Sequence, residues 1–233
     1  MLYTEESVRA NIRNRDGKRV FFLGEKDQLT PGARDYLTGH RIEIRPASEA
    51  PIAEYKLLGG GVLKEKPEHM THLYGDVLVD KTHPRVAFRG AIDTLEAELL
   101  LCQAEAEPEI ARDLEEILSL SRELIRCEVL SQEVKWARLC GMTQEELRSR
   151  SHRPQDYYAQ PHFMPEAADG REILLLNRCR CAVRAAELAA AAAFRDADGG
   201  CTRPDILKAL NRMSSMVYLL MIRLKAKKRR GKP

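Results

Sequence analysis

Apolar residues repeat at helical spacing from about residue 87 almost to the end of the chain, and this pattern constrains the fold more than any other feature. Residues three or four positions apart share one face of a helix, so such a repeat predicts helices that each bury one side. Helices of this number and length are typical of a mainly α fold, a bundle of four or five helices. We predict helices at about 90–106, from Pro108 onward, from the capping box Thr143–Glu146 onward, at about 170–195 and at about 204–226.

The first 60 residues have a different pattern. Two β-like stretches, 19–23 and 41–45, flank a segment in which Thr30 and Pro31 are typical of a helix start. A strand, a helix and a second strand within so few residues predict a small α/β segment. We therefore divide the chain into an N-terminal α/β segment over 1–60, a helical-bundle domain over 61–226 and a basic tail over 227–233.

Composition and charge exclude several classes of protein. The chain has 233 residues and a formal net charge of +3, but seven Lys and Arg lie between 223 and 233. Without those seven, residues 1–222 carry a charge of −4, unlike the basic body of a nucleic-acid-binding protein. No apolar run approaches the roughly 18 residues of a membrane span, and the N-terminus lacks the apolar core of a signal peptide. We expect a cytoplasmic protein with neither a membrane nor a nucleic-acid partner, whose six cysteines are free thiols.

The first of the two long C-terminal helices is apolar almost all round, which predicts a buried helix. Its polar residues Asn177, Arg180, Arg184 and Glu187 are spaced three, four and three apart, so they share one narrow stripe. Buried arginines need partners, because an unpaired charge in a protein interior is costly. Two interpretations remain open. The stripe binds a polyanion such as a phosphate chain, or it belongs to a structural ion-pair network, for example with Asp93.

Two further segments carry polar residues. Asn211, Ser215 and Tyr218 form a stripe on the last helix, and if it faces the arginines it predicts one polar pocket between the two helices. The charged segment 64–73 is expected to be a loop, whose lysines together with Thr71 could bind phosphate and Mg²⁺. It lacks the glycine-rich pattern of a P-loop, which excludes a P-loop NTPase.

Five segments that occur in order resemble those of the ATP:cobalamin adenosyltransferases, in particular the ethanolamine-utilisation branch of that superfamily. They are His69–Leu73, Val79–Asp93, Phe163–Pro165, Asn177–Glu187 and Arg203–Ser215. Together they cover about residues 64–225, and their joint pattern is specific where a single piece would not be. Leu29–Arg34 near the N-terminus is also similar to that branch.

The resemblance implies a five-helix bundle that assembles as a trimer with active sites between subunits. It implies an enzyme that binds ATP, Mg²⁺ and cobalamin and transfers the 5′-deoxyadenosyl group of ATP to Co(I), with triphosphate leaving. Its expected role is to supply adenosylcobalamin for ethanolamine breakdown, in the cytoplasm or in a bacterial microcompartment. The expected protein partners are a flavin reductase and the adenosylcobalamin-dependent ammonia-lyase.

Two other kinds of protein are the alternatives. One is a non-catalytic carrier that binds a corrinoid or a nucleotide on the same bundle. The other is a helical scaffold whose basic tail binds RNA or a protein shell. Only the enzyme would produce a spectral change that depends on both ATP and Co(I).

Site residues are implied by the same resemblance. Arg180, Arg184 and Asp93 are the expected catalytic residues, with Arg180 paired to Asp93 at a subunit interface. Phe163 is expected to bind the corrinoid and to displace the lower ligand of the cobalt. The residues expected to bind ATP are Lys66, Thr71, His72, Lys81, Arg180, Arg184, Glu187 and Asn211.

The chain departs from the family pattern in two places. Lys66–Met70 occupies the position of a glycine-rich triphosphate-binding segment found in better-known relatives. Some members of the ethanolamine branch also have a cysteine-rich metal motif in the N-terminal third, whereas no cysteine here precedes Cys102. His69, His72 and His83 lack a thiolate or carboxylate at a recognisable ligand spacing. We therefore predict that the protein holds no structural metal.

Overall fold

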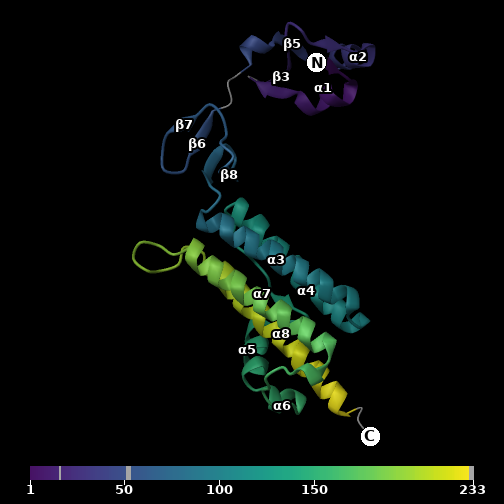
Figure 1. The fold of residues 1–233 in the computed structure, drawn as a ribbon, viewed down its shortest axis with the longest axis vertical. Coiled ribbons are helices and arrows are strands. Elements are labelled where there is room, and N and C mark those ends of the chain that lie inside the picture. Colours follow the sequence, from purple (N-terminus) through teal and green to yellow (C-terminus); the bar gives the residue numbers. More distant parts are fainter. Residues whose placement is uncertain (16, 51–53, 231–233) are drawn as a thin grey trace. The chain divides into compact units, whose positions relative to one another are not determined.

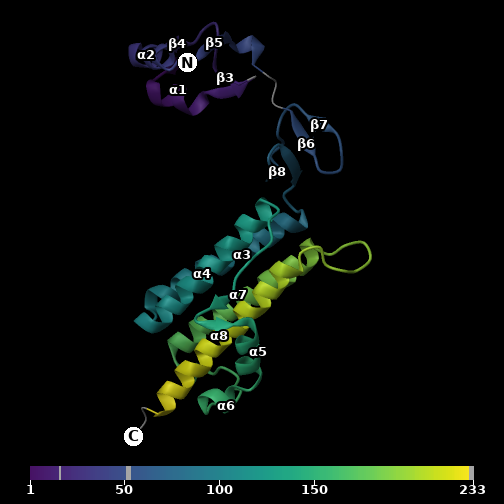
Figure 2. The same ribbon diagram turned by 180° about the vertical axis from the view of Figure 1, so that it is seen from behind.

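The computed structural model describes residues 1–15, 17–50 and 54–230, and the chain divides into two compact units (Figures 1 and 2). The first unit comprises Met1–Tyr55 and Val62–Glu65, and the second comprises Lys56–Gly61 and the chain from Lys66 onward. The long helices all belong to the second unit.

The first unit contains small sheets and two helices, of which the sequence pattern predicted the helix that begins after Thr30 and the strands on either side of it. Its elements are β1 (Leu2–Tyr3), α1 (Glu5–Asn11), β2 (Arg13–Arg15), β3 (Lys18–Leu23), β4 (Gln28–Leu29), α2 (Pro31–Gly39), β5 (Glu43–Pro46), η1 (Ala47–Glu49) and β7 (Val62–Leu63). Strand β3 pairs antiparallel with β2 and parallel with β5. Thr30 Oγ1 accepts a hydrogen bond from the Ala33 N–H at 3.3 Å and caps α2, and Pro31 is the first residue of that helix.

Three strands precede the bundle of the second unit. They are β6 (Tyr55–Leu57), β8 (Met70–Tyr74) and β9 (Val77–Asp80). Strand β9 pairs parallel with β6 and antiparallel with β8, which places Thr71 opposite Val79. The expectation of a loop over 64–73 is therefore wrong from Met70 onward. The polar residues of this segment concealed a strand whose Leu73 is buried.

The second unit is mainly helical, which confirms the mainly α part of the predicted fold class. Its helices are α3 (Pro84–Glu105), α4 (Pro108–Val129), α5 (Gln144–His152), α6 (Pro154–Tyr158), α7 (Arg171–Ala193) and α8 (Pro204–Arg230), with the short strands β10 (Arg138–Leu139) and β11 (Met142–Thr143) and the turn η2 (Ala167–Asp169). Helix α7 packs against both α3 and α8, α4 packs against α3, and α5 and α6 pack against α8. The predicted capping box is present, because Thr143 and Glu146 exchange hydrogen bonds at the start of α5.

The prediction that the helix at 170–195 is buried all round is wrong. Ile173, Leu176 and Val183 are buried, but Leu188 on the same helix is 73% exposed. Only α3 and α8 cover α7 extensively, and two neighbours leave part of the helix circumference open in the single chain. Alanines dominate its C-terminal half, and they make a helix apolar in composition without requiring burial.

The C-terminal residues continue the last helix. Helix α8 runs through Arg230, so the first part of the predicted tail at 227–233 is helical, and residues 231–233 lie outside the described chain. Lys227 forms an ion pair with Glu107. Among the described helices, none combines the length and apolarity that a membrane crossing requires.

Candidate functional site

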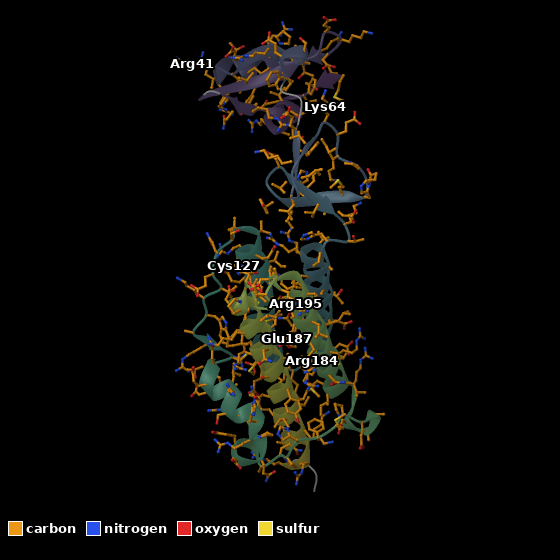
Figure 3. The ribbon with its side chains drawn as sticks, turned by 90° about the vertical axis from the view of Figure 1, so that its left-hand side faces the viewer. Arg41, Lys64, Cys127, Arg184, Glu187 and Arg195 are labelled. Atoms are coloured by element: carbon orange, nitrogen blue, oxygen red, sulfur yellow. The ribbon has the colours of Figure 1, made fainter. Side chains whose placement is uncertain are left out.

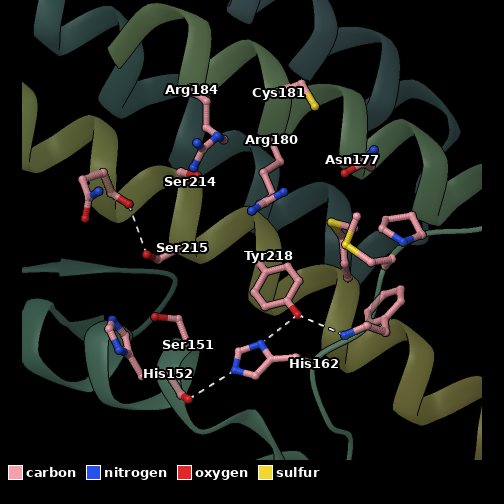
Figure 4. Close-up of a pocket in the computed structure, with 15 residues that line it drawn as sticks. Ser151, His152, His162, Asn177, Arg180, Cys181, Arg184, Ser214, Ser215 and Tyr218 are labelled. Carbon is pink, nitrogen blue, oxygen red and sulfur yellow. Dashed lines mark hydrogen bonds between the residues drawn. The ribbon is translucent and has the colours of Figure 1, made fainter. Parts of the chain in front are cut away.

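A pocket of about 880 Å³ lies between α7, α8, the C-terminal end of α5 and the segment that follows α6 (Figure 4). Polar residues of both C-terminal helices contribute to it, so the two predicted polar stripes face one cavity. The lining residues are Ser151, His152, His162, Phe163, Met164, Pro165, Asn177, Arg180, Cys181, Arg184, Asn211, Ser214, Ser215, Tyr218 and Met221.

The positive charge of the pocket comes from two arginines. Arg180 and Arg184 lie one turn apart on α7 and point toward α8 (Figure 4). Arg180 is half-buried and Arg184 is exposed. Within the described residues neither makes an ion pair, and Asp93, exposed on α3, makes none either. The structure therefore gives no support to the interpretation of a structural ion-pair network within one chain. Two cations that face one cavity are suited to an anionic ligand.

A hydrogen-bond network joins α7 to α8 beside the arginines. Asn211 Nδ2 donates to Glu187 Oε1 at 3.2 Å, and Arg212 Nη1 donates to Asn211 Oδ1 at 2.7 Å. The hydroxyl of Ser215 donates to the Asn211 carbonyl oxygen at 3.1 Å. These contacts fix the amide of Asn211 at the pocket and bring together two of the residues predicted to bind ATP.

The other side of the pocket is aromatic. The half-buried Phe163 ring is stacked near Tyr218, with centroids 6.4 Å apart and 25° between the planes. The Lys225 ammonium lies 4.9 Å from the centre of the Phe163 ring and forms an ion pair with Asp169. The Lys225 hydrogen bond lowers the pKa of Asp169, and a backbone N–H adds to this effect. The pocket thus combines a cationic side with an apolar one.

Ser151, His152 and His162 are pocket residues that the sequence did not indicate. Ser151 and His152 are the last residues of α5, and His162 lies between α6 and α7. His162 reaches the Tyr218 hydroxyl across 56 positions of sequence. Spacing in the sequence could not have indicated these residues, because only tertiary packing brings the end of α5 and the segment after α6 against α8.

Several predicted ATP-binding residues do not line this pocket. Thr71 and His72 belong to β8, and Lys81 directly follows β9. Lys66 and Lys81 are exposed, and His72 Nδ1 hydrogen-bonds with the Gly75 carbonyl oxygen at 3.0 Å. One chain therefore presents two separate groups of predicted phosphate-binding residues, the arginine pocket and the β8–β9 segment.

Metal ligands do not cluster in the described chain. No group of three or more His, Cys, Asp or Glu side chains among the described residues is placed to hold a metal ion. The cysteines are free, and Cys181 is the one that lines the pocket.

The fold and the pocket define a mainly helical protein with a cationic, partly aromatic cavity between two long helices. The chain belongs to the cobalamin adenosyltransferase family, whose sequence model matches residues 62–224. It is 32% identical over 243 residues to the corrinoid adenosyltransferase EutT of Salmonella typhimurium, an alignment that covers 94% of this chain and 90% of that protein. EutT of Escherichia coli K12 is similar to the same extent.

A solved structure shares the fold. A variant of the PduO-type ATP:corrinoid adenosyltransferase from Lactobacillus reuteri, determined in complex with ATP, matches with a TM-score of 0.52. The two sequences are 19% identical, and the match covers 70% of this chain and 92% of that one. At this identity the likeness concerns the fold.

Proposed function

We propose that this corrinoid adenosyltransferase transfers the 5′-deoxyadenosyl group of ATP to the cobalt of a reduced corrinoid and releases triphosphate. The observation that carries the proposal is the pair Arg180 and Arg184, which face a cavity of about 880 Å³ without a carboxylate partner in the described chain. Guanidinium groups present planar, paired donors that match phosphate oxygens. Glu187 and Asn211 bind ATP beside them.

The chemistry requires alignment and charge stabilisation from the protein. A reduced cobalt attacks the primary ribose carbon directly, so no side chain is needed as a general base. The negative charge that develops on the departing triphosphate is instead stabilised by fixed cations, which act strongly where water is excluded. Arg180 and Arg184 supply those cations from the pocket, and Lys81 supplies another from the β8–β9 segment.

Phe163 provides an apolar surface for the corrin. Its ring lines the same pocket as the arginines and stacks near Tyr218, next to the 84% exposed Met164. An apolar ring under the cobalt excludes a lower ligand and favours four-coordinate Co(II), which is easier to reduce. This assignment depends on the family resemblance and on the position of Phe163 in the cavity.

Mg²⁺ enters this scheme as the partner of ATP. It usually binds through substrate phosphates with only one or two protein oxygens, so a dedicated cluster of acidic residues is unnecessary. The Ser214 and Ser215 hydroxyls line the pocket near the arginines and are chemically suited to such a role. Bound there, Mg²⁺ would neutralise part of the phosphate charge.

The complete site lies between subunits of a trimer. Two observations support this proposal: the β8–β9 segment does not line the pocket of its own chain, and exposed apolar residues are available for contact. Leu101 on α3 is 54% exposed and Leu188 on α7 is 73% exposed. In the trimer, Lys81 of one subunit completes the pocket of the next, and Asp93 pairs there with Arg180.

The proposed physiological role is supply of adenosylcobalamin for ethanolamine breakdown. A flavin reductase would deliver the electrons and an adenosylcobalamin-dependent ammonia-lyase would receive the product, in the cytoplasm or in a microcompartment. The resemblance to the ethanolamine branch and the EutT relatives support this role.

The decisive experiment is incubation of the protein with ATP, Mg²⁺ and chemically reduced cobalamin. We expect the absorption spectrum of a cobalt–carbon bond, which light then abolishes, and one triphosphate released per corrin. Binding of corrinoid or ATP without this conversion would instead identify the non-catalytic carrier. Absence of both binding and conversion would leave the scaffold interpretation.

A further inference from the structure

Tyr218 lies where the cationic side of the pocket meets the aromatic side (Figure 4). The Arg180 guanidinium lies over the Tyr218 ring, 5.2 Å from its centre. The same ring is stacked on His162, with centroids 5.8 Å apart and only 8° between the planes. Although Tyr218 belongs to α8, it therefore contacts both α7 and the segment that carries Phe163.

The Tyr218 hydroxyl has two hydrogen-bond partners in that segment. It lies 3.0 Å from His162 Nδ1, and it accepts the backbone N–H of Phe163 at 3.4 Å. His162 Nε2 lies 3.2 Å from the His152 carbonyl oxygen, which can only accept, so Nε2 carries a proton. In the neutral imidazole Nδ1 then accepts the Tyr218 proton, and the phenolic oxygen keeps a lone pair for Phe163. Each donor has a matching acceptor.

The segment around Phe163 depends on such side-chain contacts. In the part of the chain that the structure describes, the backbone of 161–165 makes no hydrogen bond to another backbone group. Pro161 and Pro165 have no N–H to donate, and Met164 is exposed. The Tyr218 hydroxyl and the Lys225 ammonium over the Phe163 ring thus attach Phe163 itself to α8. The start of the segment has a separate link, because Gln160 donates to the Pro161 carbonyl oxygen and accepts from Arg229 of α8.

We propose that Tyr218 is a positioning residue that acts on the two substrates through two different parts of its side chain. Its hydroxyl holds Phe163 against the corrin, and its ring supports the guanidinium of Arg180 where the triphosphate binds. The inference rests on the proposed function, because it presupposes the roles of Phe163 and Arg180. It predicts that removal of the hydroxyl affects the corrinoid, whereas removal of the ring affects ATP as well.

The first test is Tyr218→Phe, with Tyr157→Phe as the matched control. The Tyr157 hydroxyl hydrogen-bonds to Ser149 Oγ at 2.9 Å, and Tyr157 does not line the pocket. In Tyr218→Phe we expect the KM for cobalamin to rise about 2- to 10-fold, the effect of one hydrogen bond, with the KM for ATP unchanged. Deuterium exchange in a peptide spanning 159–166 should quicken by a similar factor. Tyr157→Phe should alter neither quantity.

The second test is Tyr218→Leu, which removes the ring. Here the KM for ATP should rise as well, by several-fold, with circular dichroism used to verify the fold. If Tyr218→Phe leaves exchange and the corrinoid KM at wild-type values, or raises the ATP KM equally, the inference is wrong. A wild-type protein that forms no product would overturn the proposed function, and the kinetic role of Tyr218 with it. An active wild type with an unaffected Tyr218→Phe variant would overturn this inference alone.

Discussion

Two arginine pairs with the same spacing have opposite surroundings in this molecule, one on α3 and one on α7. Figure 3 labels Arg184 of the α7 pair, close to Glu187 on the same helix. On α3, both Arg85 and Arg89 form ion pairs with Glu128, whose side chain is completely buried. Arg89 also donates to the Leu73 carbonyl oxygen of β8 at 2.7 Å. On α7, Arg180 and Arg184 face a cavity and have no ion-pair partner in the described chain. The first pair fastens β8 and α4 to α3, whereas the second is available to a ligand.

This contrast shows why spacing alone left two interpretations open. Arginines four positions apart share a helix face whatever lies opposite them. The deciding partner of the α3 pair, Glu128, is about 40 residues distant in sequence. A structural pair should therefore affect stability when disrupted, and a ligand-binding pair should affect turnover.

The largest expected effect is on turnover in Arg184→Ala. Loss of one fixed cation that stabilises the leaving triphosphate should lower kcat/KM by about 10²- to 10³-fold, while the melting temperature stays unchanged. Arg171→Ala is the control, since Arg171 lies on the same helix but forms an exposed ion pair with Glu105. We expect near-wild-type activity for the control. Equal losses in both variants would show that the pocket arginine has no special role.

The second effect concerns stability in Glu128→Gln. Removal of the buried carboxylate leaves two partly buried guanidiniums unpaired, so the free energy of unfolding should fall by about 3 kcal/mol. Urea denaturation followed by the fluorescence of Trp136 would measure it. In Glu105→Gln, where the ion pair is exposed, the change should be below about 1 kcal/mol. If Glu128→Gln left the free energy of unfolding unchanged, the α3 pair would contribute no more to stability than the α7 pair does.

The sequence predicted the helical part of this fold well, because amphipathic periodicity and capping residues are local signals. Thr143 with Glu146, and Thr30 with Pro31, start helices where expected. Spacing also placed Asn211 and the arginines on one face of their own helices, but that the two faces meet is seen only in the structure. The extent to which α7 is buried could not be predicted, because apolar composition does not reveal how many helices pack against it. Strand β8 could not be predicted either, because its polar residues gave no sign of the short pairing with β9.

The site was predictable only where its residues lie on regular helices. Arg180, Arg184 and Asn211 lie on the polar stripes that their periodicity predicts, and both stripes line the pocket. His162 comes from a segment without periodicity and Ser151 from the end of the short helix α5, and the approach of both to α8 depends on packing between distant parts of the chain. The catalytic and binding roles of all these residues stay predictions until variants of them are measured.

A smaller effect is expected for Lys81→Ala, which asks whether the exposed β8–β9 segment serves the pocket of another subunit. Loss of one exposed cation from the phosphates should raise the KM for ATP by about tenfold. Mixed oligomers of Lys81→Ala and Arg184→Ala chains should be more active than the mean of the two parent variants, because some sites would combine an intact Lys81 with an intact Arg184 from the neighbouring subunit. Activity at or below that mean would contradict a site shared between chains.

The smallest effect is a dependence of stability on pH that arises near Phe163. The Lys225 hydrogen bond lowers the pKa of Asp169 in the folded protein, so this carboxylate stabilises the fold above its unfolded pKa, near 4. That contribution is lost as the pH falls through the lower folded value. Asp169→Asn should therefore lower the melting temperature at pH 7 by a few degrees and lose less stability than the wild type on acidification below pH 4. The matched control is Asp198→Asn, at an exposed position after α7, which should behave as the wild type does.

Asp169→Asn should also have a kinetic effect, because Lys225 contacts the Phe163 ring. The KM for cobalamin should rise while the KM for ATP stays unchanged, since the arginine side of the pocket is left intact. Equal changes in both KM values would contradict that separation.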